Sequence, residues 1–355
     1  MLPELCLGLV MLGITAYAVL GSADFGAGFW DLTAGGDKRG GRVRGMIQRS
    51  MSPVWEANHV WLIFVIVVVW TAFPVAFGSI FSTLSIPLFL AALGIIFRGA
   101  AFALRGQAGT MREARVLGAI FASSSVLIPF CLGAALGGVA SGRVVVGNAA
   151  GDPWSSWLNP TSVLIGVLGV LTGMHLAAVF LAGDSRRAEQ PDLVRAFRTR
   201  ALISGAVTGA VALGGLLVIR GDARDLYDGL TSASGLACVA VSGLAGLGTL
   251  LLVLAERYGP ARLTAAIAVG AMTVGWAVAQ RPYFLPPELT LDEAAASDAT
   301  LGAVLVALGI GAIVLVPSLW LLYRLVLKGT LDQQFEPLDQ RFRPREASDA
   351  EGGKV

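Results

Sequence analysis

Long apolar runs separated by short polar stretches dominate this chain, and many of the runs are long enough to cross a membrane. A helix needs about 20 mostly apolar residues to span the hydrocarbon core of a bilayer. Nine segments meet this requirement, at roughly 5–30, 54–73, 77–104, 116–140, 160–182, 201–219, 229–254, 261–280 and 299–326. A tight turn is expected at 74–79, where Pro74 interrupts the apolar pattern. The pattern predicts an all-α polytopic membrane domain over 1–329.

Composition agrees with this interpretation. The chain has 355 residues, of which 55% are hydrophobic and only 14% charged, whereas a water-soluble domain carries about 25% charged residues. The net charge is +2 and the charges segregate by loop, so no nucleic-acid partner is expected. Residues 330–355 are polar, with few apolar side chains, and are predicted to form a disordered tail.

The distribution of basic residues predicts the orientation. Of the 26 Lys and Arg residues, 21 lie in the tail and in the polar stretches after the first, third, fifth and seventh segments. The intervening stretches carry only four, Arg143, Arg220, Arg224 and Arg281. Cytoplasmic loops are enriched in Lys and Arg. The N-terminus is therefore predicted to lie outside and the C-terminus in the cytoplasm, which fits an odd number of segments.

Three apolar segments each carry an ionisable residue near the predicted cytoplasmic side. Asp24 is about 20 residues into the first segment, Glu56 begins the second, and Arg98 is about 20 residues into the third. At 1.5 Å per residue, the three are expected at a similar depth. His59 follows Glu56 by three residues, and Asn58 adds an amide nearby. Ionisable groups within a bilayer are costly and usually face protein or water.

Two interpretations of this group remain open. Asp24 and Glu56 could be interfacial residues that pair to hold helices together, and this interpretation is favoured for Asp31, which is closer to the surface. Alternatively, Asp24, Glu56 and Arg98 could form a polar entrance that takes up protons from the cytoplasm. For His59, a packing role and a relay role are about equally supported.

Residues that could bind a cofactor are few. The chain has two histidines, His59 and His175, which are predicted at different depths. His175 follows Met174 among small residues, so a helix–helix hydrogen bond is favoured over a haem ligand. Cys6, Cys131 and Cys238 lie in separate segments without metal or disulfide spacing.

The glycine-rich stretch GSADFGAG lies inside the first apolar segment. It has no preceding strand and no following GK[ST], which excludes a phosphate-binding loop. Gly21, Gly26 and Gly28 are instead expected to allow close packing against a neighbouring helix.

Several stretches, in order, resemble subunit II of the cytochrome bd quinol oxidases. They are GSADFGAGFWDL (21–32), SPVWEANHVWL (52–62), AFP (72–74), IIFRGAAFALRG (95–106), PYFLPPELTLDEAAASDATLGAVL (282–305) and VPSLWLLYRLVLKG (316–329). The resemblance covers nearly the whole chain. It is specific over the first hundred residues, while the middle of the chain matches only in hydropathy.

The chain also departs from the usual family pattern. The family motif WDGN is WEAN here, with Glu56 in place of Asp and Ala57 in place of Gly. His59 stands where Gln or Glu is usual, and Ala103 replaces an acid commonly found five residues after the arginine. Ser22 lies close to the position of a second early acid. These differences indicate a divergent branch.

The resemblance implies two four-helix bundles plus a peripheral helix, in a bacterial cytoplasmic membrane. It implies a heterodimer with a subunit I that holds haem b and haem d, while this chain binds no haem itself. A structural quinone and a small accessory subunit are also compatible with it. The pair would oxidise quinol and reduce O₂ to water with cytoplasmic protons. The candidate proton-route residues are Asp24, Glu56, His59 and Arg98, supported by Trp55, Asn58 and Trp61.

Two other functions compete with this one. A proton-coupled membrane transporter would also have many helices and buried acids, but transporters often show repeats and broken helices at mid-membrane. Here the charges gather near one face. A purely structural membrane subunit, with the acids as packing groups, is the third possibility.

Overall fold

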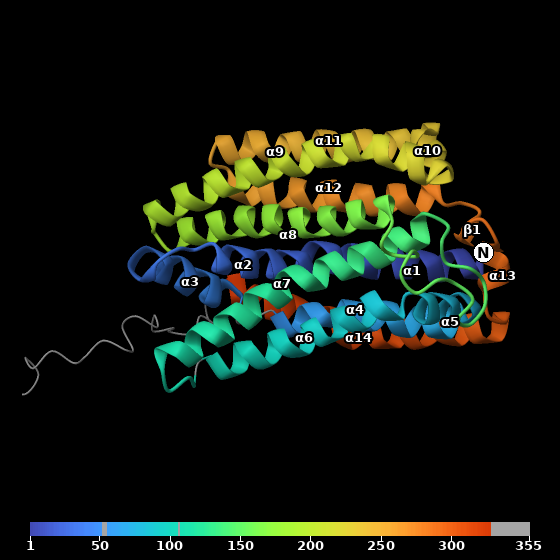
Figure 1. Cartoon of the computed structure of the whole chain (residues 1–355), viewed down its shortest axis with the longest axis horizontal. Coiled ribbons are helices and arrows are strands. Elements are labelled where there is room, and N and C mark those ends of the chain that lie inside the picture. The colour runs from blue at the N-terminus through green and yellow to red at the C-terminus, as the bar shows by residue number, and fades with distance from the viewer. Residues whose placement is uncertain (52–54, 106, 328–355) are drawn as a thin grey trace, which may run out of the picture.

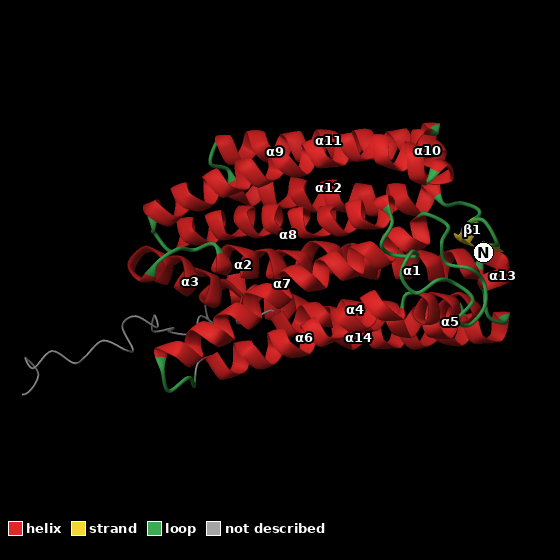
Figure 2. Cartoon of the chain, viewed as in Figure 1, coloured by secondary structure: helices red, strands yellow, loops and turns green. Residues whose placement is uncertain are grey.

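The computed structural model describes residues 1–51, 55–105 and 107–327, and the predicted tail at 330–355 lies outside them. In this described part, nine helices are long and apolar enough to cross a membrane, as predicted (Figures 1 and 2). The first comprises α1 (Leu2–Ala16), a π-helical turn η1 (Tyr17–Gly21) and α2 (Ser22–Leu32). The others are α4 (Trp55–Ala72), α6 (Ser85–Arg105), α7 (Met111–Ala140), α8 (Pro160–Arg187), α9 (Pro191–Asp222), α11 (Ala233–Leu254), α12 (Tyr258–Ala279) and α14 (Asp298–Leu327).

The spans form two four-helix bundles and a peripheral helix. In the first bundle, α1 packs on α4, while α7 contacts α2 and α6. In the second, α8 contacts α9 and α12, and α11 contacts both α9 and α12. Contacts of α8 with α2 and α7 join the bundles, and α14 packs against α1 and α4. Figure 1 shows α9 and α11 at one side of the molecule and α6 and α14 at the other.

Several short elements differ from the sequence-based expectation. The predicted turn at 74–79 is wrong, because α5 (Pro74–Thr83) is a helix that begins at the proline. Proline fits the first turn of a helix, where its missing N–H has no intrahelical acceptor. The helix is instead interrupted between Thr83, where α5 ends, and Ser85, where α6 begins. The segment expected at 229–254 is likewise divided, into α10 (Arg224–Thr231) and α11, by a Ser232 cap that accepts from the Gly235 backbone N–H.

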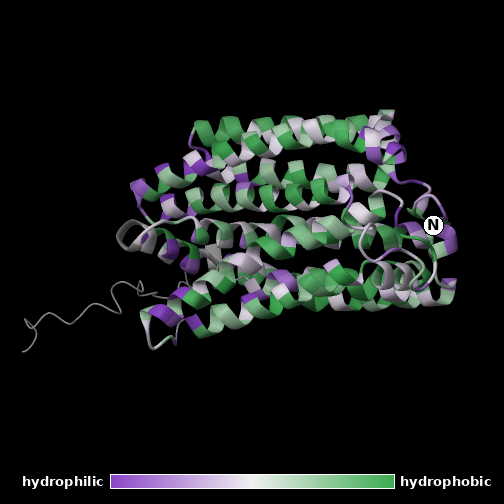
Figure 3. Cartoon of the chain, viewed as in Figure 1, coloured by the Kyte–Doolittle hydropathy of each residue, from purple (hydrophilic) through white to green (hydrophobic). Residues whose placement is uncertain are grey.

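Polar residues collect at the two ends of the bundles and apolar residues lie between them (Figure 3). One end carries the N-terminus, α10, α13 (Leu291–Ala294) and a two-stranded antiparallel sheet of β1 (Tyr283–Leu285) and β2 (Leu289–Thr290). The other end carries α3 (Asp37–Met51), an unpredicted helix in the first basic stretch. Its Val43, Met46 and Ile47 are buried in a cluster with residues of α8 and α9. We call this second end the basic end.

The two bundles approach closely where α2 crosses α8. A Cβ atom placed on Gly26 would lie 1.8 Å from the carbonyl oxygen of Gly173. Trp30 Nε1 donates to the carbonyl oxygen of Met174 at 2.9 Å beside this crossing. Gly28 faces α7 in the same way, with Ser125 against its backbone. The expected role of Gly26 and Gly28 in close packing is confirmed. This packing holds α2 between α7 and α8.

Candidate functional site

A buried polar cluster lies where α2, α4 and α6 meet, and Asp24 is its centre. The Asp24 side chain is buried on the first turn of α2. Asn58 on α4 donates its side-chain N–H to Asp24 Oδ2 and also reaches the backbone carbonyl of Leu20 at 3.4 Å. A buried carboxylate needs such partners, because burying an unpaired charge costs several kcal/mol.

Arg98 completes the cluster from α6. The side chain is buried; its Nε donates to Ser125 Oγ at 3.1 Å, and a terminal N–H reaches the Asp24 backbone carbonyl at 3.2 Å. The guanidinium lies over the rings of Phe25 and Phe121, at 5.2 and 4.9 Å from their centroids. Ring faces attract a cation, and this attraction grows when water is excluded. Arg98 is therefore held as a buried cation beside Asp24.

His59 and Tyr17 extend the cluster along α4 and η1. The Tyr17 hydroxyl and His59 Nδ1 are 3.3 Å apart, and the His59 ring packs against Tyr17, Phe25 and Trp55. A Cβ on Gly21 would come within 2.8 Å of the Tyr17 ring, so the glycine leaves room for the tyrosine. A single π-helical turn within an α-helix often marks a functional site. Here it immediately precedes the helix that carries Asp24.

Glu56 lies outside this cluster. Its side chain is exposed in the first turn of α4, and within the described residues no hydrogen bond or ion pair joins it to Asp24, His59 or Arg98. Each residue advances about 100° around a helix, so Glu56 and Asn58 point roughly 160° apart. Glu56 thus lies one helical turn before His59 but faces away from Asp24.

The two predicted supporting tryptophans differ in their surroundings. Trp55 packs against Phe102 of α6 and against His59, with ring centroids 5.2 and 6.4 Å apart. Trp61 packs against Phe64, and its Nε1 is buried without a hydrogen-bond partner in the described residues. Trp55 is therefore part of the aromatic surround of the cluster, whereas Trp61 lies further along α4.

A second buried pair lies two helical turns closer to the basic end; the sequence favours a pairing role for Asp31 but did not identify Arg105 as its partner. Arg105 donates to Asp31 at 3.0 Å, with the two side chains only 9% and 4% exposed. Asp31 follows Asp24 by seven residues and Arg105 follows Arg98 by seven, which is about 10.5 Å along each helix. Both α2 and α6 end at the basic end (Figure 1). The equal spacing was the sequence signal that could have predicted this second pair.

His175 makes the helix–helix hydrogen bond that was expected from the small residues around it. His175 Nδ1 lies 3.0 Å from the Ala201 carbonyl oxygen, which is a hydrogen bond between α8 and α9. In the described residues, no group of three or more His, Cys, Asp or Glu side chains has a metal-binding arrangement. Both histidines of the chain thus have Nδ1 engaged within the protein, at Tyr17 and Ala201.

Within the part of the chain that the structure describes, nine apolar spans and a buried acid–amide–arginine cluster define a multi-pass membrane protein with an intramembrane polar site. Ionisable groups in such positions are rare and usually serve function. The sequence matches the family model for cytochrome bd terminal oxidase subunit II over residues 2–326, and the chain belongs to that family.

Similar proteins agree with this membership. A Bacillus subtilis (strain 168) protein named as an inferred cytochrome bd menaquinol oxidase subunit II is 25% identical over 322 residues, covering 88% of this chain and 92% of the relative. The cytochrome bd ubiquinol oxidase subunit 2 of the same organism is 29% identical over 132 residues, 37% of this chain and 38% of the relative. A chain of the bd oxidase structure from Geobacillus thermodenitrificans superposes with a TM-score of 0.72 at 25% identity, covering 92% of this chain and 98% of that chain.

Proposed function

We propose that this chain is subunit II of a cytochrome bd-type quinol oxidase in a bacterial cytoplasmic membrane. It would pair with a subunit I that holds haem b and haem d, and those haems would supply electron transfer and O₂ reduction. The overall reaction is 2 QH₂ + O₂ → 2 Q + 2 H₂O. Family membership over residues 2–326 and the fold of a bd oxidase chain support this proposal.

We assign this chain's own contribution to proton uptake from the basic end. The observation that carries the assignment is the buried Asp24 carboxylate, which accepts from Asn58 and lies beside the buried Arg98. A carboxylate held between an amide and a cation can keep or release a proton without leaving the protein interior. The water-forming reaction consumes protons, so it needs such groups between the membrane surface and the partner.

The other candidate residues suggest an order along the route. Glu56 is exposed at the start of α4 and can collect a proton from solvent. His59 lies one turn further on and contacts the Tyr17 hydroxyl at 3.3 Å. Asp24 is buried at about the level of His59, because it accepts from Asn58, the residue before His59 on α4. The exposed residue therefore serves as the mouth of the route and the buried cluster as its interior relay.

Two substitutions test the assignment. Asp24→Asn keeps the size of the side chain and removes its titratable group, so we expect quinol oxidase turnover to fall at least tenfold while the complex retains its haem spectrum. Glu56→Gln should lower turnover less, because solvent can reach the cluster around an exposed residue. Asp192→Asn is the matched control: Asp192 is an exposed acid at the basic end, paired with Arg42 and Arg195, and its loss should leave turnover unchanged.

Other outcomes would contradict the proposal in different ways. Full turnover in Asp24→Asn would refute the proton route and favour a purely structural role. Loss of assembly in both Asp24→Asn and the charge-conserving Asp24→Glu would also indicate a packing group. The oxidase assignment itself is tested by tagging the chain in its host and purifying it in mild detergent. A chain that purifies alone and colourless would refute that assignment and favour the transporter alternative.

A further inference from the structure

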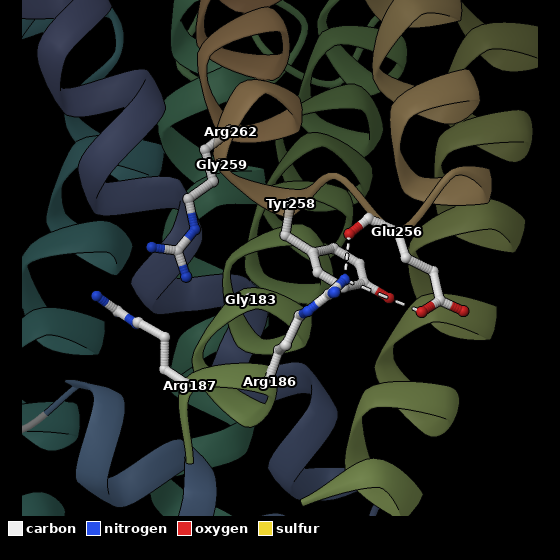
Figure 4. Close-up of a pocket in the computed structure, with 7 residues that line it drawn as sticks. All are labelled: Gly183, Arg186, Arg187, Glu256, Tyr258, Gly259 and Arg262. Carbon is white, nitrogen blue, oxygen red and sulfur yellow. Dashed lines mark hydrogen bonds and ion pairs between the residues drawn. The ribbon is translucent and has the colours of Figure 1, made fainter. Parts of the chain in front are cut away.

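An open pocket of about 580 Å³ lies at the basic end, between the C-terminal turns of α8 and the N-terminus of α12, and shares no lining residue with the Asp24 cluster. Figure 4 shows Arg187 and Arg262 on one side of it and Arg186 on the other, beside Tyr258 and Glu256. Three of the residues lining this pocket are arginines and one is an acid. We call it the arginine pocket.

The acids nearby use only part of the donor capacity of these arginines. Arg187 and Arg262 both donate to the Asp184 carboxylate. Arg186 donates to the Glu256 backbone carbonyl at 2.5 Å, and its guanidinium lies 4.0 Å from the Glu256 carboxylate. Each guanidinium has five N–H donors. Arg186 and Arg187 remain 59% and 47% exposed. The Glu256 carboxylate is also shared with Arg198 at 3.4 Å, so the pocket keeps an excess of positive charge.

Two further features of the arginine pocket attract an anion. The α12 helix begins at Tyr258, its N-cap makes no side-chain hydrogen bond, and Gly259 has open space beside its Cα atom. The N-terminus of a helix presents unpaired N–H groups and a partial positive charge to an anion. The Tyr258 side chain lines the pocket, is only 4% exposed, and has a buried hydroxyl without a hydrogen-bond partner in the described residues.

The position of the pocket indicates the source of the anion. Leu254 at the end of α11 and Leu263 on α12 flank it in sequence, and both are exposed. Leu251 and Leu247, one and two turns before Leu254, are exposed as well. Exposed leucines on spanning helices face lipid or a partner subunit. A phosphate held by the arginines would thus have apolar helix surface next to it for acyl chains. Basic pockets between spanning helices suit anionic lipid headgroups.

We propose that the arginine pocket binds the phosphate of an anionic phospholipid. Arg186 and Arg187 provide exposed guanidinium groups, which bind phosphate oxygens through paired N–H donors. Arg262 and the start of α12 form the inner wall. The site is separate from the proton route, so each proposal can fail without the other.

Lipid retention in the purified oxidase complex tests this assignment. The complex is purified in mild detergent and titrated with short-chain phosphatidylglycerol, phosphatidylcholine or inorganic phosphate, and bound ligand is counted by native mass spectrometry. We expect phosphatidylglycerol to bind wild type in preference to phosphatidylcholine. The double variant Arg186→Gln/Arg187→Gln should weaken that binding at least fivefold. The double variant Arg42→Gln/Arg195→Gln removes the same charge from exposed positions at the same end and should bind as wild type does.

Several results would overturn the proposal. Equal binding of phosphatidylglycerol by wild type and by Arg186→Gln/Arg187→Gln would show that the lipid binds elsewhere. Binding of inorganic phosphate as tight as that of phosphatidylglycerol would show that the pocket takes a free anion instead. If the double glutamine variant does not assemble, Arg186→Lys/Arg187→Lys keeps the charge but loses the paired donors. That variant should show an intermediate loss, and wild-type affinity there would refute paired recognition.

Discussion

Replacing Gly26 with alanine should damage both stability and turnover, because the new atom has no space. Its Cβ would lie 1.8 Å from the Gly173 carbonyl oxygen and 2.6 Å from the Met174 backbone nitrogen, whereas ordinary van der Waals contact begins at 3.4 Å. The α2 and α8 helices would therefore have to separate by roughly 1.6 Å at their crossing. Both obstacles are backbone atoms, so no side-chain rotation can relieve the clash.

The separation also disturbs the neighbouring contacts. It would stretch the hydrogen bond from Trp30 to the Met174 carbonyl, now 2.9 Å, and shift Asp24 relative to its partners on α4 and α6. Overpacking usually costs about 1–3 kcal/mol, and we expect the upper end of that range here. In the purified complex, Gly26→Ala should lower the midpoint of thermal unfolding by several degrees and reduce quinol oxidase turnover.

The matched control lies in the same membrane span. Gly8 on α1 has nothing within 4 Å of an added Cβ, so Gly8→Ala should leave both the unfolding midpoint and turnover close to wild type. In a helix interior, alanine is favoured over glycine by about 1 kcal/mol, so a small increase in stability is also consistent. An unchanged unfolding midpoint in Gly26→Ala would refute the inferred backbone contact between the two bundles.

Two ion pairs, one buried and one partly buried, give further predictions. Asp31→Asn should destabilise the complex by about 3–5 kcal/mol, because it leaves the Arg105 cation buried without its carboxylate. The double variant Asp31→Leu/Arg105→Met removes both charges and should recover most of that loss. Thermal unfolding of the single and double variants measures this; additive losses would mean that the pair is not coupled. Asp222→Asn should weaken the contacts with Arg143, at 2.6 Å, and with the Thr161 hydroxyl, at 2.6 Å, by about 1 kcal/mol. Hydrogen exchange in segment 141–159 should then accelerate, and unchanged exchange would show that Asp222 does not hold this loop.

Local sequence was sufficient for the membrane spans and for part of the site. Hydropathy is a property of each segment by itself, so nine spans could be predicted without their contacts. The depth of Asp24 and Arg98 followed from counting residues along their helices. In the structure, Arg98 donates a hydrogen bond to the Asp24 backbone carbonyl. The glycines near Asp24 predicted close packing because small residues in a spanning helix have few other uses.

Only the tertiary structure decided which side chains meet. Glu56 and Asn58 are two residues apart, yet one is exposed and the other contacts Asp24, because the rotation of α4 about its axis depends on its neighbours. The Asp31–Arg105 pair required the relative position of α2 and α6. The arginine pocket brings α8 and α12 together from stretches more than 70 residues apart, such as Arg186 and Arg262. Hydropathy places each helix in the membrane, but packing between helices determines how each one is turned.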